Sequence, residues 1–138
     1  MSTLYQTRAT ATGGREGKVR TDDGLLDVTL AMPTALGGKG NGTNPEQLFA
    51  AGYAACFQSA MAFVARQQKI GLTGSTVTGV VGLAPLEVGF KLEVALEVET
   101  QGLTQDEAEA LVATAHKVCP YSNATRGNVD VAITTRAA

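Results

Sequence analysis

An apolar segment from residue 45 to about residue 70 constrains the fold more than any other feature of this chain. Asn44 is a favourable N-cap, and Pro45 suits the first position of a helix. Glu46 places a carboxylate at the positive end of the helix dipole, and Gln47 completes a partial capping box. Because no further proline interrupts the segment, the pattern predicts one long helix.

This predicted helix is apolar nearly all round. Its larger apolar residues are Leu48, Phe49, Tyr53, Phe57, Phe63 and Val64, and its small residues are Ala50, Ala51, Gly52, Ala54 and Ala55. A helix without a polar face is a buried helix, and small residues let another backbone come close. Because one sheet and one further helix give less cover than such a helix needs, we expect a homodimer to complete the fold.

In the rest of the chain, apolar and polar residues alternate in the pattern of half-buried strands. Before the helix we expect strands over residues 4–12, 18–20 and 25–31, forming a small antiparallel meander. After it we expect a hairpin of strands 75–83 and 90–98, a second helix from a capping box at Thr104 and Glu107 to just before Pro120, and a last strand near 129–135. The order β-β-β-α-β-β-α-β predicts an α+β fold in a single domain spanning residues 1–138.

Bulk composition narrows the classes of function. The 138 residues are 44% apolar and 17% charged, a globular balance, and a net charge of −2 would not attract nucleic acid or an anionic membrane. No uninterrupted apolar run approaches the roughly 18 residues of a membrane-spanning helix. The polar, Thr-rich N-terminus does not resemble a signal peptide, so we expect a soluble, cytoplasmic protein.

A glycine-rich loop, residues 37–42, precedes the long helix. We expect this loop to be mobile, because glycines hold no regular structure without help. Such loops can bind phosphate, but this one does not match G-x-x-x-x-G-K-[ST], and Pro45 breaks the G-x-G-x-x-G pattern. Nucleotide binding is therefore not expected.

Two cysteines offer the clearest chemistry. Cytosolic disulfides are mostly transient, catalytic or sensing, and inert buried thiols are the other interpretation. Cys56 lies about three turns into the predicted helix, beyond the reach of the N-terminal dipole, so a thiolate there needs a cation from elsewhere. Cys119 ends the second predicted helix, where the dipole disfavours a thiolate, which suits either a resolving thiol or a packing residue.

Arg15 is the candidate cation, because the glycines of its turn allow close approach to another element. Glu46 could orient the guanidinium through a bidentate pair and exchange a proton during a reaction at the thiol. Plain surface roles for both residues stay open. Glu46 and Cys56 are ten positions apart on one helix, roughly 15 Å, so either the helix is interrupted after Glu46 or one subunit supplies Arg15 and Glu46 to the other. We favour the second arrangement.

His116, the only histidine, precedes Cys119 by three residues. It could form a Cys–His pair or bind a metal. Two thiols and one imidazole fall short of the usual four ligands of a structural zinc site, and the spacing matches no zinc motif. We therefore expect no metal and no cofactor, and a surface role for His116.

Three segments resemble the organic hydroperoxide resistance proteins, within the superfamily of the osmotically inducible protein C. They are GGREG at residues 13–17, TNPEQLFAAGYAACF at 43–57 and VCPYSNATRGN at 118–128. The resemblance implies that Cys56 is the peroxidatic cysteine and Cys119 the resolving cysteine. It implies that Arg15 and Glu46 activate the thiolate and bind the peroxide.

The same resemblance implies a cytoplasmic, intertwined homodimer with two long central helices and no metal or flavin. Its substrate would be an organic hydroperoxide, reduced to an alcohol through a Cys56 sulfenic acid and a Cys56–Cys119 disulfide. Lipoyl groups on protein partners, or another dithiol, would restore both thiols. An apolar pocket of Phe49, Tyr53, Phe57 and Phe63 would favour alkyl and fatty-acid hydroperoxides.

Two other classes of function stay open. One is a peroxide-sensing or hydrophobic-ligand-binding module whose cysteines change state without turnover. The other is a dithiol oxidoreductase acting on protein disulfides, although the chain has no C-x-x-C motif. Catalytic consumption of a hydroperoxide with a dithiol separates the three.

Overall fold

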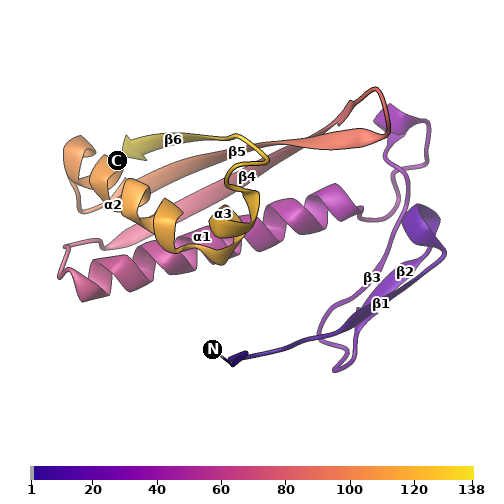
Figure 1. Cartoon of the computed structure of the whole chain (residues 1–138), viewed down its shortest axis with the longest axis horizontal. Helices are drawn as coiled ribbons and strands as arrows, with labels where there is room; N and C mark the ends of the chain where they lie inside the picture. Colours follow the sequence, from indigo (N-terminus) through magenta and orange to yellow (C-terminus); the bar gives the residue numbers. More distant parts are fainter. Residues whose placement is uncertain (1) are drawn as a thin grey trace. The chain divides into compact units, whose positions relative to one another are not determined.

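The computed structural model describes residues 2–138. Its strands and α-helices follow the order β-β-β-α-β-β-α-α-β, which is the predicted order with one short helix added. The chain divides into two compact units, Met1–Leu48 and Phe49–Ala138, and each contains a three-stranded sheet (Figure 1). The predicted α+β fold is confirmed.

The first unit contains the predicted antiparallel meander. Its strands are β1 (Ala9–Thr12), β2 (Lys18–Thr21) and β3 (Asp27–Thr29), in the order β1-β2-β3. β1 is shorter than the predicted strand 4–12, because β2 provides partners only for its last four residues. The 3-10 helix η1 (Gly14–Glu16) forms the turn between β1 and β2. Every residue of β1 is exposed in the single chain.

The glycine-rich loop 37–42 has a defined backbone conformation in the first unit. It follows the 3-10 helix η2 (Thr34–Leu36), and the N–H of Gly40 donates to the carbonyl of Met32. Backbone carbonyl groups of the segment before the loop therefore accept hydrogen bonds from the loop and hold its conformation. Motion of this loop stays a prediction.

Helix α1 (Pro45–Gln67) is the predicted long helix, and it ends slightly before the expected residue 70. Asn44 caps it, because its Oδ1 accepts a hydrogen bond from the N–H of Gln47 at 2.9 Å. The Gln47 side chain accepts from the Thr43 hydroxyl at 2.7 Å, rather than completing the capping box. Since α1 is continuous, the interruption after Glu46 that we considered does not occur.

Within the second unit α1 is buried on one side only. Its residues Tyr53, Phe57, Met61 and Val64 are 0–2% exposed, whereas its small residues Ala51, Ala55 and Ser59 are exposed, as is Phe63. By length and composition alone α1 could span a membrane, with a mean hydropathy of 1.5 over 18 residues, which the sequence analysis did not anticipate. The core helix of a soluble protein passes the same test, and the buried side of α1 lies in the hydrophobic core.

The sheet of the second unit holds the predicted hairpin. Strands β4 (Gly74–Pro85) and β5 (Phe90–Gln101) pair antiparallel, and β6 (Val131–Ala137) pairs parallel with β5. The buried β5 residues Val94, Leu96 and Val98 belong to the same hydrophobic core as α1 and the second helix. The helices of this unit thus cover one face of the sheet (Figure 1).

The parallel pairing of β5 and β6 requires a crossover, and two helices make it. α2 (Gln105–Val118) begins with the predicted capping box of Thr104 and Glu107 and ends before Pro120, as predicted. The short helix α3 (Pro120–Thr125) was not predicted, although proline at the first helical position is a signal for it. Cys119 is both the C-cap of α2 and the N-cap of α3.

Candidate functional site

The two cysteine side chains meet in the second unit. The Cys119 thiol donates to Sγ of Cys56 across 3.4 Å, and both cysteines are free. Because a disulfide bond is about 2.05 Å long, the sulfur atoms need to approach by only about 1.4 Å to form one. Cys119 is 0% exposed and Cys56 is partly exposed, so Cys56 is the thiol that an incoming molecule can reach.

The junction of α2 and α3 holds Cys119 in this position. The Cys119 N–H donates to the carbonyl of Ala115 in the last turn of α2, and the Cys119 carbonyl accepts from the N–H of Asn123 in α3. Pro120 cannot continue α2, because it has no N–H to donate. The chain therefore turns at Cys119, and the side chain points toward α1.

The surroundings of Cys56 in its own unit do not favour a thiolate. Burial is the largest effect and raises the pKa of the Cys56 thiol, while the backbone N–H of Tyr121 acts in the opposite direction. The Cys119 thiol raises the pKa further, and the net shift is upward. This agrees with the expectation that Cys56 needs a cation from outside its own helix.

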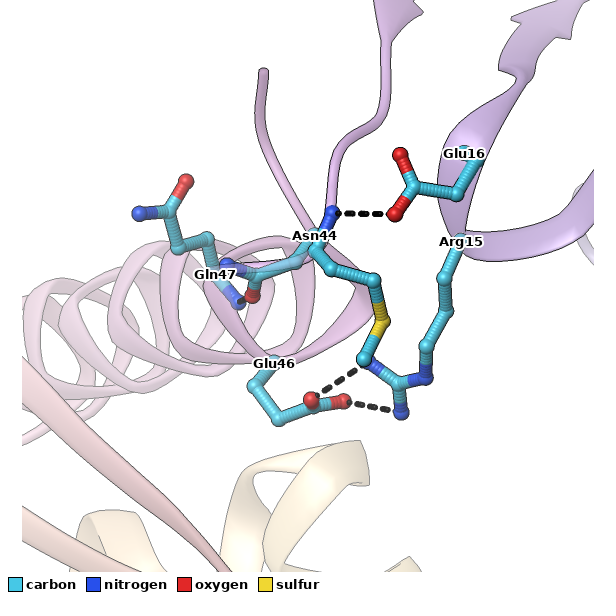
Figure 2. A network of polar contacts seen from close by, with 6 residues as sticks. Arg15, Glu16, Asn44, Glu46 and Gln47 are labelled. Carbon is cyan, nitrogen blue, oxygen red and sulfur yellow. Dashed lines mark hydrogen bonds and ion pairs between the residues drawn. The ribbon is translucent and has the colours of Figure 1, made fainter. Parts of the chain in front are cut away.

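Arg15 and Glu46 form the predicted bidentate ion pair within the first unit (Figure 2). The Arg15 Nη1 donates to Glu46 Oε1 at 2.7 Å, and Nη2 donates to Oε2 at 3.0 Å. The two side chains are 36% and 16% exposed, so the guanidinium keeps an open side. The hydrogen bond to Glu46 is the main reason that the pKa of Arg15 is raised, and Arg15 is therefore a permanent cation.

Local structure positions both partners of this ion pair. Arg15 lies in η1, and a Cβ at Gly17 would lie 1.7 Å from the carbonyl oxygen of Thr12, so only glycine fits where the turn closes. The neighbouring Glu16 accepts a hydrogen bond from the N–H of Met32 at 3.3 Å, which ties the turn to the chain beyond β3. Glu46 is held in the first turn of α1 by the Asn44 cap.

The predicted aromatic pocket residues occupy different environments. Phe49, Tyr53 and Phe57 follow one another along α1 with ring centroids 6.2 and 6.4 Å apart. Tyr53 and Phe57 are 0% exposed and belong to the core, whereas Phe63 is 43% exposed. Tyr121, which the sequence analysis did not single out, contacts Phe49 and Tyr53 with centroids 6.2 and 5.7 Å away. Pocket roles for the four predicted residues stay a proposal.

Tyr121 packs over a glycine of α1. A Cβ at Gly52 would lie 2.8 Å from the Tyr121 hydroxyl and 3.3 Å from its ring. The missing side chain at Gly52 therefore makes room for the Tyr121 ring one turn before Cys56. Glycine weakens a helix interior, so its presence at position 52 needs an explanation, and the packing of the Tyr121 ring provides one.

His116 is part-buried rather than a plain surface residue. Its Nδ1 lies 2.8 Å from Oγ of Ser122, and Ser122 Oγ lies 2.7 Å from the Tyr53 hydroxyl. Burial and then the charge of Arg126 lower the pKa of His116. Within residues 2–138, no group of three or more His, Cys, Asp and Glu side chains is placed to hold a metal ion.

Comparisons with known proteins show the family to which the chain belongs. The model of the family described as OsmC-like protein matches residues 38–134. The organic hydroperoxide resistance protein of Xanthomonas axonopodis pv. citri is 53% identical over 95% of this chain and 94% of its own length. Bacillus subtilis organic hydroperoxide resistance protein OhrB is 51% identical over 93% of this chain and 95% of its own length.

Solved structures of organic hydroperoxide resistance proteins are also similar to this chain. The crystal structure of an organic hydroperoxide resistance protein from Legionella pneumophila has a TM-score of 0.95 and 60% identity, covering 99% of this chain and all of that one. The Bacillus subtilis OhrB structure has a TM-score of 0.87 and 49% identity, covering 96% of this chain and 99% of its own. This chain belongs to the organic hydroperoxide resistance proteins of the OsmC-like family.

Proposed function

We propose that residues 1–138 act as one catalytic domain, a cysteine-based peroxidase of the cytoplasm that reduces organic hydroperoxides to alcohols. The observation that carries the proposal is the pair of free thiols 3.4 Å apart, one reachable and one fully buried. The relatives are named organic hydroperoxide resistance proteins, which points to the same substrate class.

The proposed reaction has three steps. The Cys56 thiolate attacks the terminal oxygen of the hydroperoxide, the O–O bond breaks, and the leaving alkoxide takes a proton to become the alcohol. The sulfenic acid left on Cys56 then condenses with the Cys119 thiol, forming the disulfide and releasing water. A dithiol reduces this disulfide through a mixed disulfide, and is itself oxidised to a disulfide.

Activation of Cys56 is assigned to Arg15 and Glu46 of a second copy of the chain. The raised pKa of Cys56 in its own unit calls for a cation. Glu46 and Cys56 are ten positions apart on the continuous helix α1, roughly 15 Å. Arg15 uses two of its five N–H groups on Glu46, so others are free to bind a peroxide oxygen and the thiolate.

The exposed parts of the chain support a homodimer. Ala51, Ala55 and Ser59 leave one side of α1 uncovered, and every residue of β1 is exposed. A second copy could cover both. In this proposal the apolar residues near Cys56, of which Phe49 is part-buried and Tyr121 is 39% exposed, favour alkyl and fatty-acid hydroperoxides.

The reductant is proposed to be a lipoyl group on a protein partner, or a dithiol of similar size. Cys119 is 0% exposed, so a reductant would reach only the Cys56 sulfur of the disulfide. A flexible dithiol at the end of a long arm can enter such a site more easily than a cysteine pair on the surface of a folded protein. This favours a lipoyl group over a dithiol oxidoreductase partner.

The proposed function is tested by following tert-butyl hydroperoxide with dihydrolipoamide as the reductant. We expect many equivalents of peroxide to be consumed per chain, and Cys56→Ser to abolish the reaction. Consumption of one equivalent without turnover would instead support the peroxide sensor. In Cys119→Ser, a sulfenic acid should persist on Cys56 long enough to be trapped by dimedone.

Mixed dimers test the assignment of Arg15 across the interface. When Cys56→Ser and Arg15→Ala chains are combined, one site of the mixed dimer contains an intact Cys56 and an intact Arg15 only if they come from different chains. Regained activity therefore supports the arrangement in trans. A mixed dimer as inactive as either parent contradicts it.

A further inference from the structure

Three polar side chains, two of them fully buried, are joined by hydrogen bonds on the helical segments that carry the cysteines. The Tyr53 hydroxyl on α1, the Ser122 hydroxyl on α3 and Nδ1 of His116 on α2 are joined by contacts of 2.7 and 2.8 Å. Tyr53 and Ser122 are 0% exposed. The proposed reaction uses none of these groups, yet buried polar groups of this kind are costly unless every one finds a partner.

The direction of the hydrogen bonds follows from the acceptors that the chain offers. When His116 is neutral with its proton on Nε2, Tyr53 donates to Ser122, and Ser122 donates to Nδ1 of His116. Both hydroxyl protons then have acceptors. A protonated Nδ1 would itself donate to Ser122, and then either the Ser122 or the Tyr53 hydroxyl proton would have no acceptor within residues 2–138, so an unprotonated Nδ1 fits best.

The spacing of the three residues relates them to the thiols. Tyr53 is three positions before Cys56, His116 is three positions before Cys119, and Ser122 is three positions after Cys119. Each is thus close to one helical turn from a cysteine on its own helical segment. Ser122 is the central member, and its hydroxyl connects α3 to α1, which carries Cys56, and to α2, which leads to Cys119.

A direct chemical role for Ser122 is excluded by its burial, because a peroxide cannot reach a side chain with no exposed surface. We propose that Ser122 is a positioning residue that, with Tyr53 and His116, holds Cys119 against Cys56 so that disulfide formation outruns a second oxidation of Cys56. The inference rests on the proposed function and adds to it the element that sets the inter-sulfur distance.

Two reactions compete for the Cys56 sulfenic acid. The Cys119 sulfur can displace its hydroxyl group, which leaves as water, or a second hydroperoxide can transfer an oxygen atom and leave a sulfinic acid and an alcohol. The first depends on the effective concentration of Cys119 at Cys56, and the second on the hydroperoxide concentration. Loosening α3 from α1 therefore lowers the first rate and leaves the second unchanged.

The experiment measures the reduction potential of the Cys56–Cys119 disulfide in dithiothreitol redox buffers, with intact protein. In Ser122→Ala we expect the effective concentration of the thiol pair to fall about tenfold, the effect of a lost buried hydrogen bond. For a two-electron couple this raises the potential by about 30 mV. After a peroxide pulse, mass spectrometry should find a larger sulfinic fraction of Cys56 in this variant.

Two further variants keep the test decisive. Tyr53→Phe removes one hydroxyl but keeps the ring in the core, so it should fold even if Ser122→Ala does not, and its potential should rise by less. Thr125→Val is the matched control, because Thr125 is a buried residue of α3 whose hydroxyl donates only to the carbonyl of Ser122 in the same helix. Its potential should equal that of the wild type.

The inference is overturned if the folded variants at Ser122 and Tyr53 keep the wild-type potential. It is also overturned if Thr125→Val shifts the potential as much as Ser122→Ala does, since the cause would then be general loosening of α3. The potential is measured without peroxide. A wild-type protein that fails to turn over peroxide would therefore contradict the proposed function. The reduction potentials would still test whether Ser122 positions Cys119.

Discussion

At the scale of single residues, the proposed peroxidase reaction depends on a positive charge close to the Cys56 thiol. Burial and the Cys119 thiol keep the pKa of Cys56 raised, and only a backbone N–H opposes them within the same unit. Arg15 is a cation whose guanidinium group is already oriented by its two hydrogen bonds to Glu46. A guanidinium fixed in this way can stabilise the thiolate and the developing alkoxide without reorganising.

Replacing Arg15 by lysine should therefore slow the reaction with hydroperoxide on the order of 100-fold, because lysine keeps the charge but loses the bidentate geometry. The measurement is stopped-flow oxidation of the reduced protein by tert-butyl hydroperoxide. Arg20→Lys is the control, since Arg20 is an exposed arginine of the same unit that pairs with Asp27. An Arg15→Lys variant with the wild-type rate constant would contradict our account of activation.

His116 should make stability depend on pH. Its pKa is lowered in the folded protein by burial and by Arg126, so the unfolded chain binds more protons at moderately acidic pH. The stabilisation is fully present above the unfolded pKa of about 6.5 and is lost as pH falls from there toward the folded pKa. Urea unfolding between about pH 5 and pH 8 should show this loss. In His116→Asn, the free energy of unfolding should fall less steeply as the pH decreases. A fall as steep as in the wild type would contradict this role of His116.

At the scale of elements, the contact between α1 and α3 determines how the cysteine-bearing segments meet. The Tyr121 ring occupies the space over Gly52, and the Tyr53–Ser122 hydrogen bond lies beside it. A small residue on one helix and a large one on the other let the backbones come close. In our proposal, this packing of α3 on α1 holds the two sulfur atoms 3.4 Å apart.

A double-mutant cycle tests the packing of Tyr121 on Gly52. In a Tyr121→Ala background, Gly52→Ala should stabilise the protein by up to about 1 kcal/mol, because alanine is the better helix former. In the wild-type background this gain should vanish or reverse, since the new Cβ would lie 2.8 Å from the Tyr121 hydroxyl. Urea unfolding gives both values. Equal effects of Gly52→Ala in the two backgrounds would show that Tyr121 does not pack there.

At the scale of the whole molecule, one chain leaves apolar and small residues uncovered. The exposed side of α1 carries Ala51, Ala55 and Ser59, and a helix of this mean hydropathy is rarely left facing water. A homodimer that buries this side explains the composition of α1 without a membrane. It also allows Arg15 and Glu46 to act on the Cys56 of the other chain.

Ala51→Glu should therefore shift the protein from dimer toward monomer in sedimentation equilibrium, because the new carboxylate would have to be desolvated in the interface. Ala113→Glu is the matched control, since Ala113 is an exposed alanine of α2. We expect the control to keep the wild-type oligomeric state. A wild-type chain that sediments as a monomer would contradict the proposed dimer.

Local signals in the sequence were sufficient for most of the elements. Asn44 and Pro45 marked the start of α1, Thr104 and Glu107 marked the start of α2, and strand alternation marked the hairpin of β4 and β5. These signals work because capping and periodicity depend on residues within one or two turns. The short helix α3 was missed, because its tertiary contacts stabilise a segment too short to show a period.

The sequence by itself determined the identity of the candidate residues, since Cys56, Cys119, Arg15 and Glu46 all lie in segments that resemble the family. Only the tertiary structure decided that the two thiols meet and that a guanidinium pairs with Glu46, because these contacts join positions 63 and 31 residues apart. It alone also revealed the contacts of Tyr121, Ser122 and His116 with the residues around them. Contacts between distant segments depend on packing, and no local pattern encodes them.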